Sequence, residues 1–281
     1  MPLPIPASET RSPERVRAHY LIERELAARL REGTKAERRV LYRSVYDELF
    51  QRVPDHPQLT QQIDAAAREA EINESLALLR PFLRPETRYL EIGPGDCALA
   101  IAVAARVRQV YALDVSEEIA SRAVLPGNVE RIITDGCSVP VPAGSVDVAF
   151  SDQLMEHLHP DDAVEQLGEI YRALRRGGVY ICLTPNRWSG PHDVSRYFDD
   201  VATGFHLREY SVIELTRLFR EAGFRKLRVL VGSKSANLQV PAAVGTLVEQ
   251  TLALMPRRFG RKMAGALPLR TMLGVKLIAQ K

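Results

Sequence analysis

A short segment that combines glycines with carboxylates is the strongest chemical signal in the sequence. It reads Glu91-Ile92-Gly93-Pro94-Gly95-Asp96-Cys97 and follows a short apolar run. Glycines at such a turn let a ligand approach the backbone closely. Asp114 comes 21 residues after Gly93 and can accept two hydrogen bonds from ribose hydroxyls. The spacing therefore predicts a site for a ligand that contains a nucleoside.

Two classes of ligand fit this spacing. Gly93, Gly95 and Ala98 satisfy the dinucleotide fingerprint G-x-G-x-x-A. A dinucleotide would place its anionic pyrophosphate at the helix N-terminus, where the carboxylates of Glu91 and Asp96 would repel it. S-adenosylmethionine carries an ammonium and a sulfonium, and carboxylates suit both cations. The charges favour S-adenosylmethionine, and a plain strand-to-helix turn is the structural alternative.

Histidines supply the candidates for proton transfer, which a methyl transfer to a hydroxyl requires. His157 is the first candidate for the base, and a histidine that braces the next helix is the alternative at even weight. His206 is the second candidate, and a satisfied hydrogen bond within its loop is its alternative. His192 and Asp152 are weaker candidates. Glu156 is expected to orient a neighbour rather than to titrate.

A long loop at residues 185–210 is rich in aromatic and polar side chains. Loops of this length inside compact domains are usually functional. The residues predicted to contact the acceptor are Trp188, His192 and Tyr197 of this loop, and Tyr46 from the N-terminal region. Tyr42 and Tyr46 lie four residues apart, and core packing is the favoured alternative for both. Aromatic rings with a few polar groups suit a ring-bearing or sugar-like acceptor.

Short apolar runs alternate with helical segments from Arg88 onward, which predicts a parallel sheet covered on both faces. The predicted strands are Tyr89–Ile92, Gln109–Leu113, Val129–Thr134, Val146–Phe150, Val179–Leu183, Phe224–Val231 and Gly274–Ala279. The predicted helices are Ala98–Ala105, a short one capped by Ser116, Asp161–Arg175, and one that begins at Ser211 and ends at Gly223. Ligands are expected at the carboxyl ends of these strands.

The first 84 residues predict a helical N-terminal cap, followed by an α/β domain over residues 85–281. Ser12-Pro13 begins one helix, and Thr34 with Glu37 forms a capping box for a second that runs to about Val53. A third helix carries Ile63, Ala67, Ala70, Leu76 and Leu79 on one face.

Residues 235–272 predict a basic, helical insert between the last two strands. After Met255 the chain has seven Lys or Arg residues and no Asp or Glu. A cover over the edge of the sheet is the favoured interpretation. A peripheral contact with anionic lipid is the alternative.

Composition narrows the class of protein. The chain has 281 residues, a formal net charge of +3 and 46% hydrophobic residues, which suits a domain with a substantial core. No basic arm with interleaved aromatics is present, so no nucleic-acid partner is expected.

Three features predict a cytoplasmic protein without a metal site. Cys97, Cys137 and Cys182 are widely spaced and suggest neither a zinc site nor a disulfide framework. The segment 1–10 lacks the apolar stretch of a signal peptide, and no apolar run reaches about 18 residues.

Residues 86–184 resemble the class I methyltransferase domain, especially the branch similar to ubiquinone- and menaquinone-biosynthesis methyltransferases. The resemblance rests on the Glu91–Cys97 segment, the Thr134-Asp135-Gly136 segment, the proline-marked loop that begins at Val139, and the Ser151–Leu158 stretch. Cys97 replaces the third glycine of the family's fuller pattern. The resemblance implies a Rossmann-like, seven-stranded, mostly parallel sheet whose last strand is antiparallel.

The resemblance also implies roles for individual residues. It implies S-adenosyl-L-methionine as cofactor, bound by Glu91, Gly93, Pro94, Gly95, Asp114, Val115, Asp135, Gly136 and Ser151. Asp135 would contact the exocyclic amine of adenine, and Gly136 would lie near the ring. The expected activity is methyl transfer (EC 2.1.1.-), with O-methylation of a small molecule, sugar or glycoconjugate favoured. The alternatives are an NAD(P)-dependent oxidoreductase and a non-catalytic protein that keeps the fold.

Overall fold

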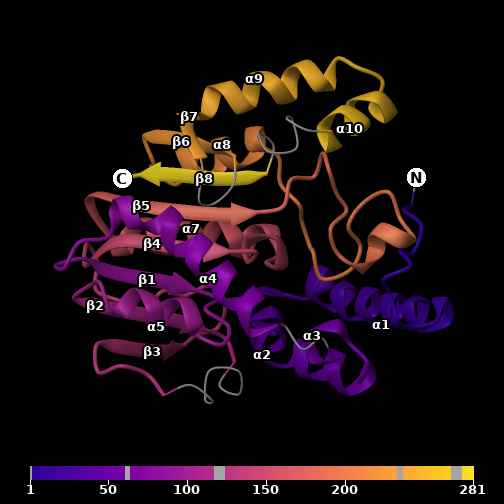
Figure 1. Cartoon of the computed structure of the whole chain (residues 1–281), viewed down its shortest axis with the longest axis horizontal. Helices are drawn as coiled ribbons and strands as arrows, with labels where there is room; N and C mark the ends of the chain where they lie inside the picture. Colours follow the sequence, from indigo (N-terminus) through magenta and orange to yellow (C-terminus); the bar gives the residue numbers. More distant parts are fainter. Residues whose placement is uncertain (1, 61–63, 117–123, 233–236, 267–273) are drawn as a thin grey trace.

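The first three helices of the N-terminal cap lie beyond the carboxyl ends of the central strands, and the fourth lies over one face of the sheet (Figure 1). The computed structural model describes residues 2–60, 64–116, 124–232, 237–266 and 274–281. The helices of this region are α1 (Pro13–Glu32), α2 (Lys35–Arg52), α3 (Pro57–Thr60) and α4 (Ala65–Leu79), with a 3-10 turn at Arg80–Phe82. The predicted capping box at Thr34 and Glu37 is confirmed, since each side chain bonds the other's backbone N–H. Ile63 lies outside the described residues.

The sheet contains eight strands within the described residues. They are β1 (Arg88–Ile92), β2 (Gln109–Asp114), β3 (Val129–Ile133), β4 (Val146–Asp152), β5 (Leu174–Thr184), β6 (Lys226–Gly232), β7 (Asn237–Pro241) and β8 (Val275–Gln280). Their order is β3-β2-β1-β4-β5-β8-β6-β7. The first five in this order are parallel, and β8 is antiparallel to both of its neighbours. The predicted fold class is therefore confirmed.

The eighth strand corrects the predicted strand count. Strand β7 lies in the segment that the sequence predicted as a helical insert, and it pairs with β6 in antiparallel register. It is an edge strand, and Pro241, which has no N–H to donate to a ladder, is its last residue. The pairing depends on the neighbouring strand, so this short segment alone did not predict it.

Helices cover both faces of the sheet, because alternate side chains of each strand point to opposite faces. In β5, Tyr180 and Cys182 pack in the cluster that includes α7 (Pro160–Ala173) and α8 (Val212–Glu221). Ile181 and Leu183 pack on the other face with α4 and α5 (Ala98–Ala104). Helices α1 and α2 contribute Leu26, Val45 and Leu49 to the first cluster, so the cap shares a core with the α/β layer.

The predicted helix Asp161–Arg175 is two residues too long. Helix α7 ends at Ala173, and Leu174 begins β5. The glycines that were expected to stop the helix lie inside β5, where the register shifts against β4. A Cβ at Gly178 would lie 2.9 Å from the Arg175 carbonyl oxygen, so the close approach of backbone requires glycine there.

The C-terminal insert contains two helices, α9 (Ala242–Ala253) and α10 (Arg257–Gly265). Helix α9 contacts α8, β6 and β7 and covers this edge of the sheet, and α10 packs on α9 away from these strands (Figure 1). Leu247, Leu254 and Phe259 are exposed on these helices. In the described ranges, no helix has the length and apolar character of a membrane span. The short helix predicted after Ser116 falls on residues outside those ranges.

Candidate active site

The glycine segment lies at the point where the strand order reverses. The chain leaves β1 toward β2 and β3 on one side and returns to β4 on the other, so the carboxyl ends of β1 and β4 diverge there. Gly93 and Gly95 have φ angles of 71° and 53°, which favour glycine. A Cβ at Gly93 would lie 3.1 Å from Leu154 Cδ1, while a Cβ at Gly95 would meet no atom within 4 Å. The turn therefore leaves open space beside Gly95, and Pro94 between the two glycines is buried.

Cys97 shows why the family pattern prefers glycine at its position. It is the residue before α5 and has a φ of 61°, in the left-handed region. A residue other than glycine is strained there, by an amount on the order of 1 kcal/mol. The side chain of Cys97 is fully buried in the core on that face of the sheet, so this departure keeps the turn and adds packing.

Asp114 ends β2 beside this turn. Its Oδ1 accepts hydrogen bonds from the backbone N–H groups of Val115 at 2.7 Å and Ser116 at 3.0 Å. Burial raises the pKa of Asp114, against the lowering effect of the N–H groups of Ser116, Val115 and Gly95. The structure thus brings Asp114, Val115 and Gly95 together, as the sequence spacing predicted.

Glu91 is a buried carboxyl group at the end of β1. Glu91 is 5% exposed, and the Tyr89 hydroxyl donates a long hydrogen bond of 3.5 Å to its carboxyl group. Among the described residues no Lys or Arg forms an ion pair with Glu91. Burial raises the pKa of Glu91 to about 8. A cation placed beside this group would restore its ionised form.

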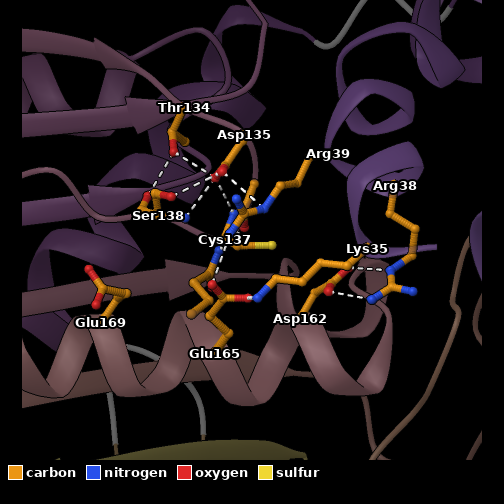
Figure 2. A network of polar contacts seen from close by, with 12 residues as sticks. Lys35, Arg38, Arg39, Thr134, Asp135, Cys137, Ser138, Asp162, Glu165 and Glu169 are labelled. Carbon is orange, nitrogen blue, oxygen red and sulfur yellow. Dashed lines mark hydrogen bonds and ion pairs between the residues drawn. The ribbon is translucent and has the colours of Figure 1, made fainter.

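The Asp135 carboxylate accepts hydrogen bonds from neighbouring residues of the protein and forms an ion pair (Figure 2). Its Oδ1 accepts from the N–H groups of Cys137 at 3.0 Å and Ser138 at 2.7 Å, and its Oδ2 accepts from the Ser138 hydroxyl. Arg39 Nε of α2 lies 3.2 Å from Oδ2. Burial alone would raise the pKa of Asp135, but these hydrogen bonds and Arg39 lower it. Contact with an adenine amine would have to be shared with Arg39.

Gly136 follows Asp135 and is held between two helices. Its φ is 88°, and a Cβ there would lie 2.9 Å from the Tyr42 ring. Its carbonyl oxygen accepts a 2.7 Å hydrogen bond from Gln166 of α7. Helix α2 of the cap therefore covers one side of the segment that is predicted to lie beside adenine.

A buried ion pair joins α2 to α7 next to this segment (Figure 2). Arg38 donates two hydrogen bonds of 2.6 Å to Asp162, and the Tyr42 hydroxyl donates a third at 2.8 Å. A second pair, Lys35 with Glu165 at 2.6 Å, is more exposed. These contacts fix α2 over the end of β3.

An open cavity of about 840 Å³ lies between the cap and the 185–210 loop. Five of the chain's six histidines line it. The predicted site residues that it brings together are Tyr46, His157, His192, Tyr197 and His206. Trp188 lies elsewhere, in contact with the cluster of Leu252 and Ala264 under the C-terminal insert. Ser151 is fully buried, with its Oγ 2.7 Å from the Tyr180 hydroxyl.

The two candidate bases lie side by side in this cavity, with ring centroids 4.9 Å apart. His157 Nδ1 lies 2.9 Å from the Tyr46 hydroxyl and 3.1 Å from the Phe205 carbonyl oxygen. Burial lowers the pKa of His157 to about 3. His206 Nδ1 lies 2.8 Å from Glu209 Oε1. Burial opposes protonation of His206, but Glu209, with Glu156 and Asp193, raises its pKa overall.

Sequence reasoning missed the carboxylates that surround these histidines. Glu209 follows His206 at a spacing of three, which was a readable signal. On α1, His19 and Glu23 lie at a spacing of four, with His19 Nε2 2.9 Å from Glu23 Oε2. Glu156 was expected to orient a neighbour, and its Oε2 accepts a 2.9 Å hydrogen bond from Thr184. Burial raises the pKa of Glu156 to about 7.

Comparisons with known proteins agree with this architecture. Residues 90–182 match the methyltransferase domain family. A protein of Mycolicibacterium smegmatis, named as a probable S-adenosylmethionine-dependent methyltransferase, is 37% identical over 138 residues, which are 48% of this chain and 51% of that protein. The chain spans about half the length of the curated relatives it matches.

Two solved structures share the fold. One is the [4+2]-cyclase SpnF, with a TM-score of 0.53 and 21% identity over 78% of this chain and 85% of that one. The other is Haemonchus contortus phosphoethanolamine N-methyltransferase 1 in complex with phosphoethanolamine and S-adenosylhomocysteine, with a TM-score of 0.50 and 20% identity over 65% of this chain and 40% of that one. One fold thus carries two kinds of reaction. Residues 90–182 of this chain are thus similar to the methyltransferase domain family, and the chain shares the fold of these solved structures.

Proposed function

We propose that this protein transfers a methyl group from S-adenosylmethionine to a small acceptor held in the histidine-lined cavity. The observation that carries the proposal is the open space beside Gly95, with Asp114 and the buried carboxyl group of Glu91 next to it. These groups fit a ligand that combines a ribose with an ammonium, and they disfavour a pyrophosphate. The names of the mycobacterial relatives support the same cofactor.

Each residue at the ends of the first strands has a part in binding. Asp114 accepts hydrogen bonds from ribose hydroxyls, with Val115 beside it, and Glu91 faces the ammonium. Gly93, Pro94 and Gly95 let the ligand approach the backbone. Asp135, Gly136 and Ser151 complete the site, Asp135 in competition with Arg39. When bound, S-adenosylmethionine supplies a methyl group already activated by its sulfonium.

The acceptor that we propose is a hydroxylated small molecule, sugar or glycoconjugate. The cavity offers aromatic faces from Tyr46, Tyr197 and Phe205 among many polar groups. That combination suits sugar rings, whose flat apolar faces stack on aromatics while their hydroxyls take hydrogen bonds. Trp188, which packs under the insert, has no part in this proposal.

For a hydroxyl acceptor, we assign the proton to His206 Nε2. The acceptor oxygen forms the new bond to carbon, the sulfur keeps the electron pair of the broken bond, and the ring takes the proton. Glu209 supports this role, because a carboxylate on Nδ1 orients the ring and stabilises its protonated form. His157, the first candidate from the sequence, has no carboxylate on Nδ1, and its pKa is lowered by burial.

Calorimetry with S-adenosylhomocysteine tests the cofactor assignment, with NAD as the competing ligand. We expect Asp114→Ala to weaken binding about 100-fold, since hydrogen bonds to a charged acceptor contribute about 1.5–3 kcal/mol each. Asp161→Ala, an exposed acid outside the site, is the matched control. Tighter binding of NAD, or unchanged affinity in Asp114→Ala, would overturn the proposal. Labelled methyl uptake by a panel of sugars and phenols then tests the acceptor.

A further inference from the structure

Two histidines of the cavity wall and a fully buried glutamate next to them each have one polar atom held by the protein and a second that is left over. They are Glu156 and His157, next to each other after β4, and His206 of the 185–210 loop. One ligand atom of each lies within 4.8 Å of those of the other two. Their sequence separation of about 50 residues is closed only in the folded chain.

His206 presents Nε2. Its Nδ1 lies 2.8 Å from Glu209 Oε1, and because a carboxylate only accepts, Nδ1 carries the hydrogen. Glu209 is itself held by the His192 N–H at 2.6 Å. A histidine whose second nitrogen donates to a carboxylate is the usual arrangement around a metal ion.

His157 presents Nε2 for the same reason. Its Nδ1 lies 3.1 Å from the Phe205 carbonyl oxygen, which only accepts, and 2.9 Å from the Tyr46 hydroxyl, which can accept as well as donate. In the part of the chain that is described, no hydrogen bond occupies Nε2 of either ring. When Nδ1 donates its hydrogen to the Phe205 carbonyl, Nε2 of His157 keeps its lone pair for a ligand contact, as Nε2 of His206 does.

Glu156 presents Oε1. The residue is fully buried, Thr184 donates to Oε2, and Oε1 has no hydrogen-bond partner among the described residues. A buried carboxylate oxygen without a partner keeps the full cost of its desolvation. No hydrogen bond joins it to either imidazole within the described residues. The three groups therefore converge without satisfying one another.

We propose that Glu156, His157 and His206 form a binding site for a divalent transition-metal ion of the Zn²⁺ class. Two imidazoles and one carboxylate are a ligand set of catalytic zinc sites, which keep further positions open. With metal–ligand distances of about 2.0–2.2 Å, tetrahedral ligands lie roughly 3.3 Å apart, so ligand atoms that now lie within 4.8 Å of one another would have to approach by up to about 1.5 Å. Both histidines line the cavity, so the open position faces the acceptor.

The second group of potential ligands in the cavity, His19, Glu23 and His56, differs in a decisive way. Both oxygens of Glu23 are bonded, to His19 Nε2 and to the Phe205 N–H, each at 2.9 Å. The guanidinium of Arg11 lies 3.1 Å from His19 Nδ1 and would repel a cation. This group is satisfied without an ion, and it serves as an internal control.

Metal binding does not depend on the proposed methyl transfer, because it is measured without cofactor or acceptor. If both hold, the ion takes the place of the proton on His206. It would then lower the pKa of an acceptor hydroxyl in the cavity, whose proton leaves to solvent.

The test is titration of the chelator-treated protein with Co²⁺, followed by its visible d–d absorption, and with Zn²⁺ by calorimetry. We expect one ion per chain. Glu156→Gln should weaken binding at least 100-fold, and Glu209→Gln, which removes only the support of His206, 10- to 100-fold. Circular dichroism checks that each variant is folded. His159→Ala, a histidine outside the cavity, and His19→Ala should bind as the wild type does.

Two outcomes would overturn the proposal. One is the absence of Co²⁺ bands in the wild type at millimolar ion. The other is Co²⁺ binding that His19→Ala abolishes and Glu156→Gln leaves intact, because the ion would then belong to the group of His19, Glu23 and His56. A wild-type protein that binds Co²⁺ but transfers no methyl group to any acceptor tested would instead count against the proposed function alone.

Discussion

At the scale of single residues, two carboxyl groups near the proposed sites are buried away from solvent. Glu91 is 5% exposed without an ion pair among the described residues, and Glu156 is fully buried with one oxygen unbonded. Burial of each disfavours its charged form. Such groups weaken the fold unless a ligand compensates them, so they are expected at sites that bind cations.

Binding of S-adenosylmethionine should release a proton through Glu91. The pKa of this carboxyl group is raised to about 8, so at about pH 7 it is mostly protonated. An ammonium favours the ionised form, so the affinity should rise close to tenfold per pH unit between about pH 6 and 7.5. Calorimetry in buffers of different ionisation enthalpy measures the proton, and Glu91→Gln should lose it. An affinity that does not change with pH would argue against an ammonium at Glu91.

His206→Ala should slow the chemical step more than His157→Ala does. With a hydroxyl acceptor, we expect a loss of about 100-fold or more from His206→Ala, with cofactor affinity nearly intact. The comparison is made in single turnovers of chelator-treated protein, so that only proton transfer to the protein is measured. If His157→Ala lowers the single-turnover rate more than His206→Ala does, His157, the first candidate from the sequence, is the base.

At the scale of elements, helix α2 covers one side of the proposed cofactor site. The ring of Tyr42 lies against Gly136. Arg39 forms an ion pair with Asp135, and Arg38 pairs with Asp162 of α7 (Figure 2). The side chains of Arg38 and Asp162 are 6% and 1% exposed, so their pair is shielded from solvent. Loss of one partner leaves the other buried and uncompensated.

Arg38→Met should therefore lower the free energy of unfolding by about 3–5 kcal/mol. Lys35→Ala, which breaks the more exposed pair with Glu165, should cost no more than about 1 kcal/mol. Urea unfolding at one pH measures both. The double variant Arg38→Met with Asp162→Leu should recover part of the loss, and a cost in the double variant equal to the sum of the single ones would deny the coupling.

At the scale of the whole molecule, the cap and the α/β layer share one hydrophobic cluster. It includes Leu26 of α1, Val45 of α2, Leu90 of β1 and Phe219 of α8. The division into a cap and an α/β domain at residue 84, predicted from the change from helices to alternating strands and helices, stays a prediction. A shared core makes separate folding of the two parts costly.

We expect one cooperative unfolding transition. Trp188, the single tryptophan, reports on the region under the C-terminal insert, while far-ultraviolet circular dichroism is weighted by all helices, those of the cap included. The two signals should coincide in urea. An earlier transition by circular dichroism than by fluorescence would mean that the cap unfolds alone.

Most of the architecture could be predicted from the sequence, because its signals are local. The turn from Glu91 to Cys97, the capping box at Thr34 and the alternation within β5 each depend on residues a few positions apart. Backbone conformation and side-chain period decide them. The ends of elements were less certain: α7 stops before its glycines because β5 pairs with β4 from Leu174.

Only the tertiary structure decided which polar atoms meet. The sequence by itself determined that a carboxylate follows β3, but not that Arg39, almost a hundred residues earlier, would form an ion pair with it. It determined that Trp188 lies in a long loop, but not that the insert would cover it. It placed Glu156 and His206 on separate segments, and folding brings their ligand atoms within 4.8 Å. Hydrogen bonds and charges act only over a few ångströms, so partners distant in sequence are selected by the packing that closes the loops between them.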